Sequence, residues 1–185
     1  MLSVKPAGMQ GNWMNEYTKV YHNIPPLWRP DSRVLILGSF PSPKSREAQF
    51  FYGHQRNRFW PVLAAVFGEA VPATVPEKRA LAHRHYIAMW DTIVECEIRG
   101  ASDTSIRNPV PNDLNAVIGK SMIKAVFCTG AASYQYYVRL CEADTGIRAV
   151  RLPSTSPANA ACSFEKLKEA YRVIPETVAE LLKQS

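Results

Sequence analysis

The chain has 185 residues, of which 46% are hydrophobic, and a formal net charge of +6 at pH 7. This length predicts one domain with a sizeable core, and the composition excludes a disordered chain. No run of about 18 apolar residues is present and the N-terminus lacks the apolar segment of a secretory signal, so we expect a cytoplasmic protein without a membrane span. The basic charge is compatible with a nucleic-acid partner without requiring one.

The four cysteines give no sign of a metal site. Cys96, Cys128, Cys141 and Cys162 include no C-x-x-C pair, so the usual spacing of a zinc ribbon or an iron–sulfur cluster is missing. We interpret them as reduced structural residues and expect no metal.

The first part of the chain is polar and aromatic and ends in the proline-rich residues 25–30. We expect residues 1–30 to form an arm that packs on a single domain of residues 31–185. The first core strand is predicted at 33–38, because Val34-Leu35-Ile36-Leu37 is an apolar run typical of a strand buried on both faces.

Helices and strands are predicted to alternate along the rest of the chain. Residues 87–94 contain a strand that ends near Asp91, and residues 95–112 have the Gly, Ser and Pro content of a long irregular connection that serves a site. The alternation implies a parallel sheet with helices on both faces. Strands are further expected at 124–129 and 148–152, and helices at 57–67, 77–85, 112–122, 131–143, 164–171 and 175–183.

The stretch after the first strand carries the chemistry. Gly38 ends the strand, and the prolines at 41 and 43 force a turn. Residues 50–60 are then crowded with aromatic, basic and amide side chains. An α/β fold keeps its site where a strand ends in such a turn.

Residues 38–45 also come close to the phosphate-binding pattern G-x-x-x-x-G-K-[ST] of nucleoside triphosphatases. The mismatch is Pro43, which stands where the pattern has its second glycine. Such a loop binds phosphate through consecutive backbone N–H groups, and Pro41 and Pro43 each remove one. We therefore rank this interpretation low.

Three segments, in this order, resemble the uracil-DNA glycosylase superfamily, and most closely its hypoxanthine-DNA glycosylase branch. They are residues 35–42 (LILGSFPS), 51–60 (FYGHQRNRFW) and 152–159 (LPSTSPAN); Trp90-Asp91 with 106–109 (IRNP) is similar to that branch too. The resemblance implies a three-layer α/β/α sandwich with a central four-stranded parallel sheet. It also implies excision of deaminated bases from DNA, without metal or cofactor, after the base is flipped into a pocket.

The resemblance further implies which residues handle the base. Asn57 would position or activate the water, because Phe40 stands where several relatives have a polar Asn or Asp. Tyr52, in preference to Phe40, would stack on the base, and Asp91 takes the place where relatives carry the Asn that reads the base edge. The turn would line the base pocket and offer backbone donors: Gly38, Ser39, Phe40, Pro41 and Ser42.

DNA contacts are expected on both sides of this pocket. Ser154 stands where the best-known uracil enzymes have a His, which is consistent with a different base preference. The basic residues Lys44, Arg46, Arg56 and Arg58 are expected to contact phosphates, with a solvated face as the alternative. The loop that would grip phosphates and enter the space left by the base is Ser154, Thr155, Ser156, Pro157, Ala158 and Asn159.

Each assignment has a structural alternative. Asn57 fits a helix N-cap, Tyr52 a core position, Asp91 a loop cap or the partner of an Arg, and Ser154 and Thr155 a loop brace.

The predicted function is a monomeric, monofunctional glycosylase of base-excision repair, with hypoxanthine as first and uracil as second substrate. No Lys in the three segments is placed for a Schiff base, so lyase activity is not expected. Two other classes stay open: a non-catalytic nucleic-acid-binding α/β module and the triphosphatase.

Overall fold

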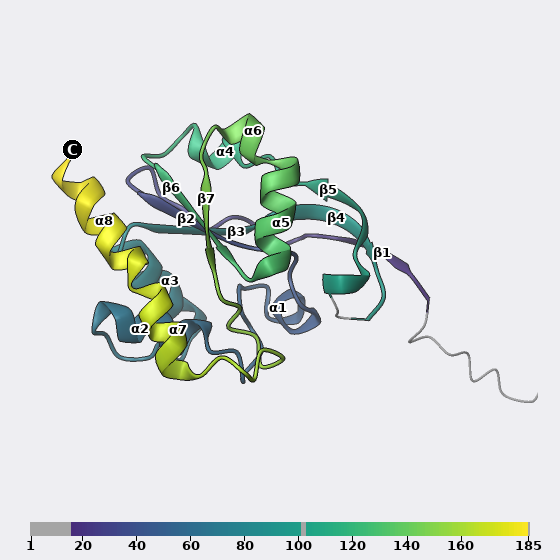
Figure 1. Ribbon diagram of the computed structural model, residues 1–185, viewed down its shortest axis with the longest axis horizontal. Helices are drawn as coiled ribbons and strands as arrows, with labels where there is room; N and C mark the ends of the chain where they lie inside the picture. Colours follow the sequence, from purple (N-terminus) through teal and green to yellow (C-terminus); the bar gives the residue numbers. More distant parts are fainter. Residues whose placement is uncertain (1–15, 101–102, 185) are drawn as a thin grey trace, which may run out of the picture.

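The structure, a computed structural model, describes residues 16–100 and 103–184. Its centre is a four-stranded parallel sheet in the order β3-β2-β6-β7 (Figure 1). The residues from Val34 to Leu37 in β2 are all 0% exposed, as an apolar run between two neighbouring strands should be. The strands are β2 (Val34–Gly38), β3 (Ile87–Asp91), β6 (Ala125–Thr129) and β7 (Ala149–Leu152).

Helices cover both faces of this sheet. Because side chains alternate along a strand, Val34 and Ile36 of β2 join one buried cluster, and Leu35 and Leu37 join another. The first cluster is covered by α2 (Phe59–Phe67), α3 (Val75–Arg84), α7 (Phe164–Tyr171) and α8 (Val173–Lys183). The second is covered by α4 (Asn115–Ile118) and α5 (Ala131–Leu140), with α6 (Glu142–Thr145) following α5. The predicted three-layer sandwich is confirmed.

A second sheet, which the sequence did not predict, stands beside the first. It is antiparallel, with the order β1-β4-β5: β1 (Thr18–Tyr21), β4 (Ile93–Ile98) and β5 (Arg107–Pro111). The expectation of an irregular connection over residues 95–112 was therefore wrong. Register shifts between β4 and β5 break the period-two pattern, and the prolines of β5 are tolerated because it is an edge strand. A single 3-10 turn, η1 (Asp103–Ser105), lies between β4 and β5.

The helix boundaries also differ in informative ways. Helix α1 (Pro43–Ala48) was not expected; Ser42 caps it by accepting a hydrogen bond from the Ser45 N–H. Asn112 was predicted to cap a helix over 112–122, but α4 starts three residues later. Instead the Asn112 side chain is buried and its amide donates to the Asp91 carbonyl, 2.8 Å away.

The expected arm is described only in part, since residues 1–15 lie outside the described residues. From residue 16 the segment runs along the domain: β1 pairs with β4, and Leu27 exchanges backbone hydrogen bonds of 3.0 and 2.8 Å with Met89 of β3. The segment thus reaches the carboxyl end of the central sheet, where the site lies.

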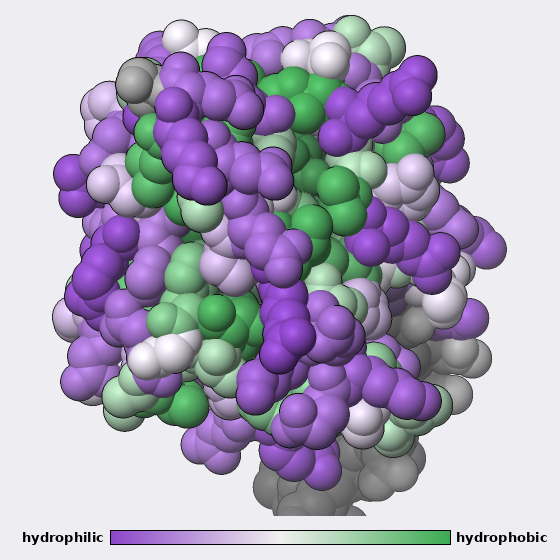
Figure 2. All heavy atoms as spheres, turned by 60° about the vertical axis from the view of Figure 1, so that its left-hand side comes forward, coloured by the Kyte–Doolittle hydropathy of each residue, from purple (hydrophilic) through white to green (hydrophobic). Residues whose placement is uncertain are grey.

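Figure 2 looks at the side formed by α2, α3, α7 and α8, which hydrophilic side chains mostly cover. Over residues 16–100 and 103–184, no helix is long and apolar enough to cross a membrane. In the same ranges, no group of three or more His, Cys, Asp or Glu side chains is arranged to hold a metal ion.

Candidate active site

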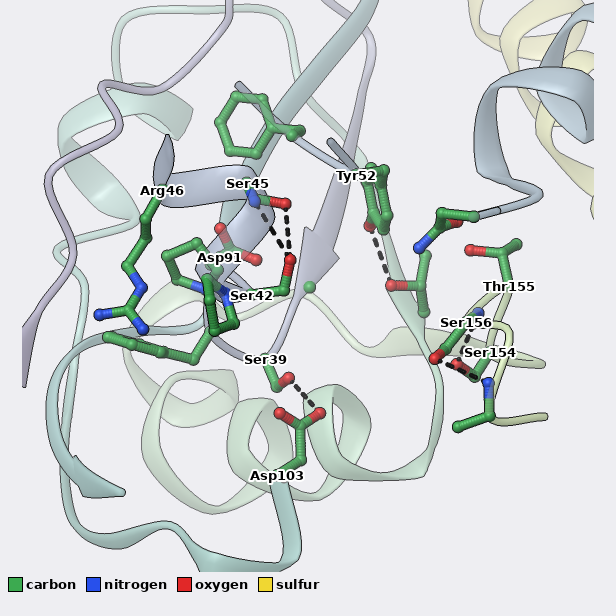
Figure 3. A pocket seen from close by; sticks show the side chains of 18 of the residues that line it. Ser39, Ser42, Ser45, Arg46, Tyr52, Asp91, Asp103, Ser154, Thr155 and Ser156 are labelled. Carbon is green, nitrogen blue, oxygen red and sulfur yellow. Dashed lines mark hydrogen bonds between the residues drawn. The ribbon is translucent and has the colours of Figure 1, made fainter. Parts of the chain in front are cut away.

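A pocket of about 500 Å³ opens at the carboxyl ends of the central strands. This is where ligands bind in open α/β sheets. The turn after β2 forms one wall, the end of β3 and the start of η1 another, and the loop after β7 a third (Figure 3). The predicted site residues among its lining are Gly38, Ser39, Phe40, Pro41, Ser42, Tyr52, Asn57, Asp91, Ser154, Thr155, Ser156, Ala158 and Asn159.

Gly38 and Asp91 meet at the base of the pocket. They are opposite each other in the register of β2 and β3. A Cβ atom added to Gly38 would lie 2.2 Å from the Asp91 Oδ1 atom, a distance that no real contact allows. Only a glycine at this position lets the Asp91 carboxylate lie over the end of β2.

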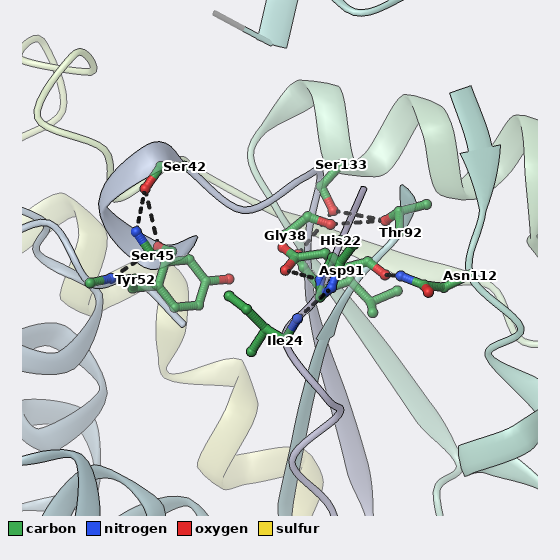
Figure 4. A network of polar contacts seen from close by, with 12 residues as sticks. His22, Ile24, Gly38, Ser42, Ser45, Tyr52, Asp91, Thr92, Asn112 and Ser133 are labelled. Carbon is green, nitrogen blue, oxygen red and sulfur yellow. Dashed lines mark hydrogen bonds and ion pairs between the residues drawn. The ribbon is translucent and has the colours of Figure 1, made fainter. Parts of the chain in front are cut away.

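The Asp91 carboxylate is buried and paired with a histidine from the N-terminal segment. The His22 Nε2 atom is 2.8 Å from Asp91 Oδ2, and the two side chains are 1% and 8% exposed. The Asn112 amide holds the Asp91 backbone at the same time (Figure 4). The charged partner of Asp91 is thus a histidine, not the Arg that one structural alternative named.

Asp103 of η1 brings a second carboxylate to the pocket. Its Oδ2 atom accepts a 2.6 Å hydrogen bond from the Ser39 hydroxyl (Figure 3). Burial raises the pKa of Asp103; the Ser39 bond acts in the opposite direction, and the nearby Asp91 charge adds to the rise. The bond ties the turn after β2 to η1 and so fixes one side of the pocket mouth.

The pocket lining also contains an arginine. Arg46 of α1 lines the cavity, and its guanidinium lies 5.9 Å from the centre of the Phe40 ring. Among the described residues its Nε atom is one of the buried nitrogens without a hydrogen-bond partner. Phe40 itself is 8% exposed and packs with Ile93 and Cys96 under the second sheet, so its ring serves as support.

Tyr52 forms an aromatic wall. Its ring stacks on Phe59 at 3.8 Å and 9°, and its hydroxyl lies 2.9 Å from the Thr129 Oγ1 atom. Burial raises the pKa of Tyr52 well above its usual value, so the phenol stays neutral at physiological pH. Its φ of +52° is unusual for a bulky residue and marks a locally strained backbone.

Asn57 lies two residues before α2. Its Oδ1 atom accepts a 2.9 Å hydrogen bond from the Phe59 N–H, so the side chain supports the helix start, although the N-cap is Arg58 and not Asn57 as the structural alternative had it. The residue also lines the pocket. The amide Nδ2 donors and one Oδ1 lone pair remain available to a water molecule.

The loop after β7 is braced from within. The Asn159 amide donates to the Ser154 carbonyl at 2.8 Å, and the Ser156 N–H donates to the Ser154 hydroxyl at 3.2 Å. Thr155 is 1% exposed and its carbonyl accepts from the Arg58 N–H. The loop is therefore a preformed wall, with the Ser154 and Ser156 side chains on its pocket side (Figure 3).

The comparisons with known proteins agree on one family. The sequence model of the Uracil DNA glycosylase superfamily matches residues 25–176. The chain belongs to this superfamily. It is therefore a DNA glycosylase, an enzyme that cuts the bond between a base and its deoxyribose.

Two relatives and one solved structure are similar to this glycosylase. The Hypoxanthine DNA glycosylase of Methanosarcina barkeri (strain Fusaro / DSM 804) is 31% identical over 117 residues, 61% of this chain and 73% of the relative. That of Methanosarcina acetivorans is 28% identical over 155 residues, 82% and 94% of the two chains. The solution NMR structure of a candidate uracil DNA glycosylase from Methanosarcina acetivorans superposes with a TM-score of 0.69 at 24% identity, covering 85% and 99%. It supports the fold.

The triphosphatase interpretation does not hold in this glycosylase. The N-terminus of α1 is capped by Ser42 and starts with Pro43, and α1 has only six residues. The Lys44 ammonium pairs with Glu47 at 2.6 Å on an exposed face. Lys44 does not line the pocket, so its predicted phosphate contact has no support in the site's geometry.

Arg56 and Arg58 differ although they are two residues apart. Arg56 is exposed beside the pocket mouth. The Arg58 guanidinium is directed into the loop after β7, where it donates to the carbonyls of Asn159 at 2.8 Å, Ser156 at 3.3 Å and Cys162. Its structural task is to hold this loop.

We predict that Arg58→Ala lowers the free energy of unfolding by about 1–3 kcal/mol, as expected for carbonyls that lose a charged donor. DNA affinity should also fall, because the loop loses its shape, while the salt dependence of binding stays unchanged. Thermal unfolding and binding at several salt concentrations measure both. A reduced salt slope would instead mean that Arg58 contacts a phosphate.

Sequence reasoning missed the part that three residues play in this site: His22, Asp103 and Asn112. Arg46 was expected on phosphate and lines the pocket, and Asp103 carried a signal, since it lies in a stretch that the sequence marks as site-bearing. Asn112 was predicted to be a helix cap. His22 gave no local signal, because its partner lies 69 positions away along the chain.

Proposed function

We propose that this glycosylase is monofunctional, acts as a monomer in base-excision repair and removes deaminated bases from DNA, hypoxanthine first and uracil second. The observation that carries the proposal is the pocket. The Tyr52 ring, the buried Asp91 carboxylate and the Asn57 amide, whose NH₂ group has no protein partner among the described residues, line one cavity the size of a small ligand site. The two curated relatives named Hypoxanthine DNA glycosylase support the choice of the first base.

In this proposal a base is flipped out of the duplex and stacks on Tyr52, which lines the pocket and is itself backed by Phe59. The strain at the Tyr52 backbone supports a functional role, because strained residues cluster at active sites. Asp91 reads the hydrogen-bonding edge of the base. Backbone donors of the turn Gly38–Ser42 stabilise the negative charge that develops on the leaving base.

Asn57 then positions the water that adds to C1′. Its Oδ1 atom is held by the Phe59 N–H, which fixes the amide plane and directs the remaining donors. A neutral amide is a weak base, so this residue orients the water while the oxocarbenium-like sugar provides the driving force. Among the described residues that line the pocket there is no lysine, which supports hydrolysis without a Schiff base.

The test is cleavage of oligonucleotides with a single hypoxanthine, uracil or xanthine, with enzyme in excess and EDTA present, before and after alkali. Alkali-dependent strand cleavage, fastest for hypoxanthine, is the expected result. Release of uracil alone would contradict the preference for hypoxanthine. Strand cleavage without alkali would contradict the monofunctional mechanism. Tight DNA binding without any release would leave a binding module.

We further predict that Arg56→Ala weakens DNA binding and lowers the slope of log affinity against log salt by about 0.9 for duplex DNA, the loss of one phosphate contact. Arg148→Ala is the matched control, because Arg148 is exposed and directly precedes β7, at the amino end of the parallel strands and away from the pocket. Equal slopes for both variants would remove Arg56 from the DNA interface.

A further inference from the structure

The protonation of His22 can be derived from its two hydrogen bonds. Its Nδ1 atom accepts the Ile24 N–H at 3.2 Å, so Nδ1 carries no proton. The single proton of the neutral ring is then on Nε2, which donates to Asp91 Oδ2 at 2.8 Å (Figure 4). The ring is held edge-on by Phe40 and Trp90, with centroids 6.2 and 6.4 Å away.

This arrangement fixes what Asp91 can offer. One carboxylate oxygen is occupied by His22, and the other, Oδ1, lies over Gly38 at the base of the pocket. The two oxygens of a carboxylate can only accept hydrogen bonds, and His22 already engages one of them. Toward a ligand Asp91 is therefore an acceptor only, whereas the Asn that relatives carry at this place can turn either its oxygen or its NH₂ toward the base.

An acceptor in this place separates two classes of bases. Hypoxanthine carries a ring N1–H beside its carbonyl, and uracil carries a ring N3–H, so both donate to Oδ1. Adenine N1 and cytosine N3 bear lone pairs that the carboxylate repels. Sites built around a buried hydrogen bond reject analogues that lack the matching group far more strongly than apolar pockets do.

We propose that His22 is a specificity-positioning residue: it orients Asp91 as a fixed acceptor and thereby restricts the pocket to bases with a ring N–H. The inference rests on the proposed function, since it requires a flipped base in this pocket. It gives the N-terminal segment a role in base selection, because His22 directly follows β1.

Binding of uncleavable DNA tests this without depending on turnover. The probes are duplexes with one 2′-fluoro-2′-deoxyinosine or one 2′-fluoro-2′-deoxyadenosine, and the readout is the ratio of their dissociation constants. We expect wild type to favour the inosine probe by about 10-fold or more, as one base-edge contact provides. Base release, measured separately, reports on the proposed function alone.

The variant Asp91→Asn and the double variant Asp91→Asn/His22→Phe separate the reading of the base by residue 91 from the positioning of that residue by His22. In Asp91→Asn, the His22 N–H draws the amide oxygen toward itself and turns the NH₂ group toward the base, so the inosine preference should disappear or reverse. In the double variant Asp91→Asn/His22→Phe the amide is free to turn, and the preference should return in part. The single variant His22→Gln keeps an N–H donor beside the native Asp91 and should retain the inosine preference.

Thermal unfolding of each variant shows that the fold is retained. If His22 had only a structural role, the double variant would show no stronger preference for the inosine probe than Asp91→Asn does. That result, or an unchanged preference in Asp91→Asn, or no preference in wild type, would overturn the inference. A wild type that prefers inosine DNA but releases no base would leave the inference intact and refute the proposed function.

Discussion

Replacing Asn57 with alanine is expected to lower single-turnover excision of hypoxanthine by about 100-fold or more. This corresponds to about 2.7 kcal/mol of transition-state stabilisation, the scale of losing one preorganised polar group. The expectation follows from geometry: the amide lines the pocket, and its plane is fixed by the 2.9 Å bond to the Phe59 N–H. Phe40 cannot supply a polar group, and its ring is committed to the cluster with Ile93 and Cys96.

The second role of Asn57 has to be separated from the first. Loss of the contact to the start of α2 should cost about 1 kcal/mol of stability in Asn57→Ala. Asn57→Ser is the control, because a hydroxyl can accept from the Phe59 N–H but cannot hold a water at the same place. We expect near-normal unfolding with excision as slow as in the alanine variant. If serine restores excision as well as stability, Asn57 acts only at the helix start.

Gly38→Ala should be about as damaging, again by about 100-fold or more, through a different cause. The new methyl group would meet the Asp91 Oδ1 atom at 2.2 Å, and the Tyr52 hydroxyl is 3.8 Å away. The carboxylate must leave its place over β2, and it takes with it the acceptor that reads the base. A small displacement of a positioned group can slow a reaction by a factor of this size.

The matched control is Gly119→Ala. Gly119 follows α4 with a φ of −67°, which alanine adopts without strain, and its new Cβ atom would be 3.0 Å from the Asn115 carbonyl. This position is outside the pocket lining. Excision by this variant should stay near wild type. Near-normal excision by Gly38→Ala would show that Asp91 need not lie where the structure has it.

The central sheet was accessible to sequence reasoning, because its strands are short apolar runs separated by helical segments. Val34 to Leu37 and the strand ending at Asp91 were found in this way, and α7 was predicted at its observed bounds. The second sheet was not, since bulges interrupt the alternation in β4 and prolines disguise β5 as a loop. Periodicity detects regular strands, and these two are irregular.

The site residues that were predicted lie in local sequence motifs, and those that were missed depend on contacts between distant parts of the chain. The turn after β2, Tyr52, Asn57 and Asp91 follow motifs that are local in sequence, and the structure gathers them around one pocket. Arg58 was expected on phosphate because it is basic, yet its geometry makes it a loop brace. His22 and its contact with Asp91 depend on how the N-terminal segment runs along β4 and β3, and nothing local in the sequence encodes that path.

The most direct test of the central claim is chromatographic detection of free hypoxanthine released from a deoxyinosine-containing duplex. Wild type and Asn57→Ala are compared in enzyme excess with EDTA present. The account predicts stoichiometric release of hypoxanthine by wild type and release slowed by about 100-fold or more in the variant. No free hypoxanthine from wild type, or equal rates from both proteins, would contradict it.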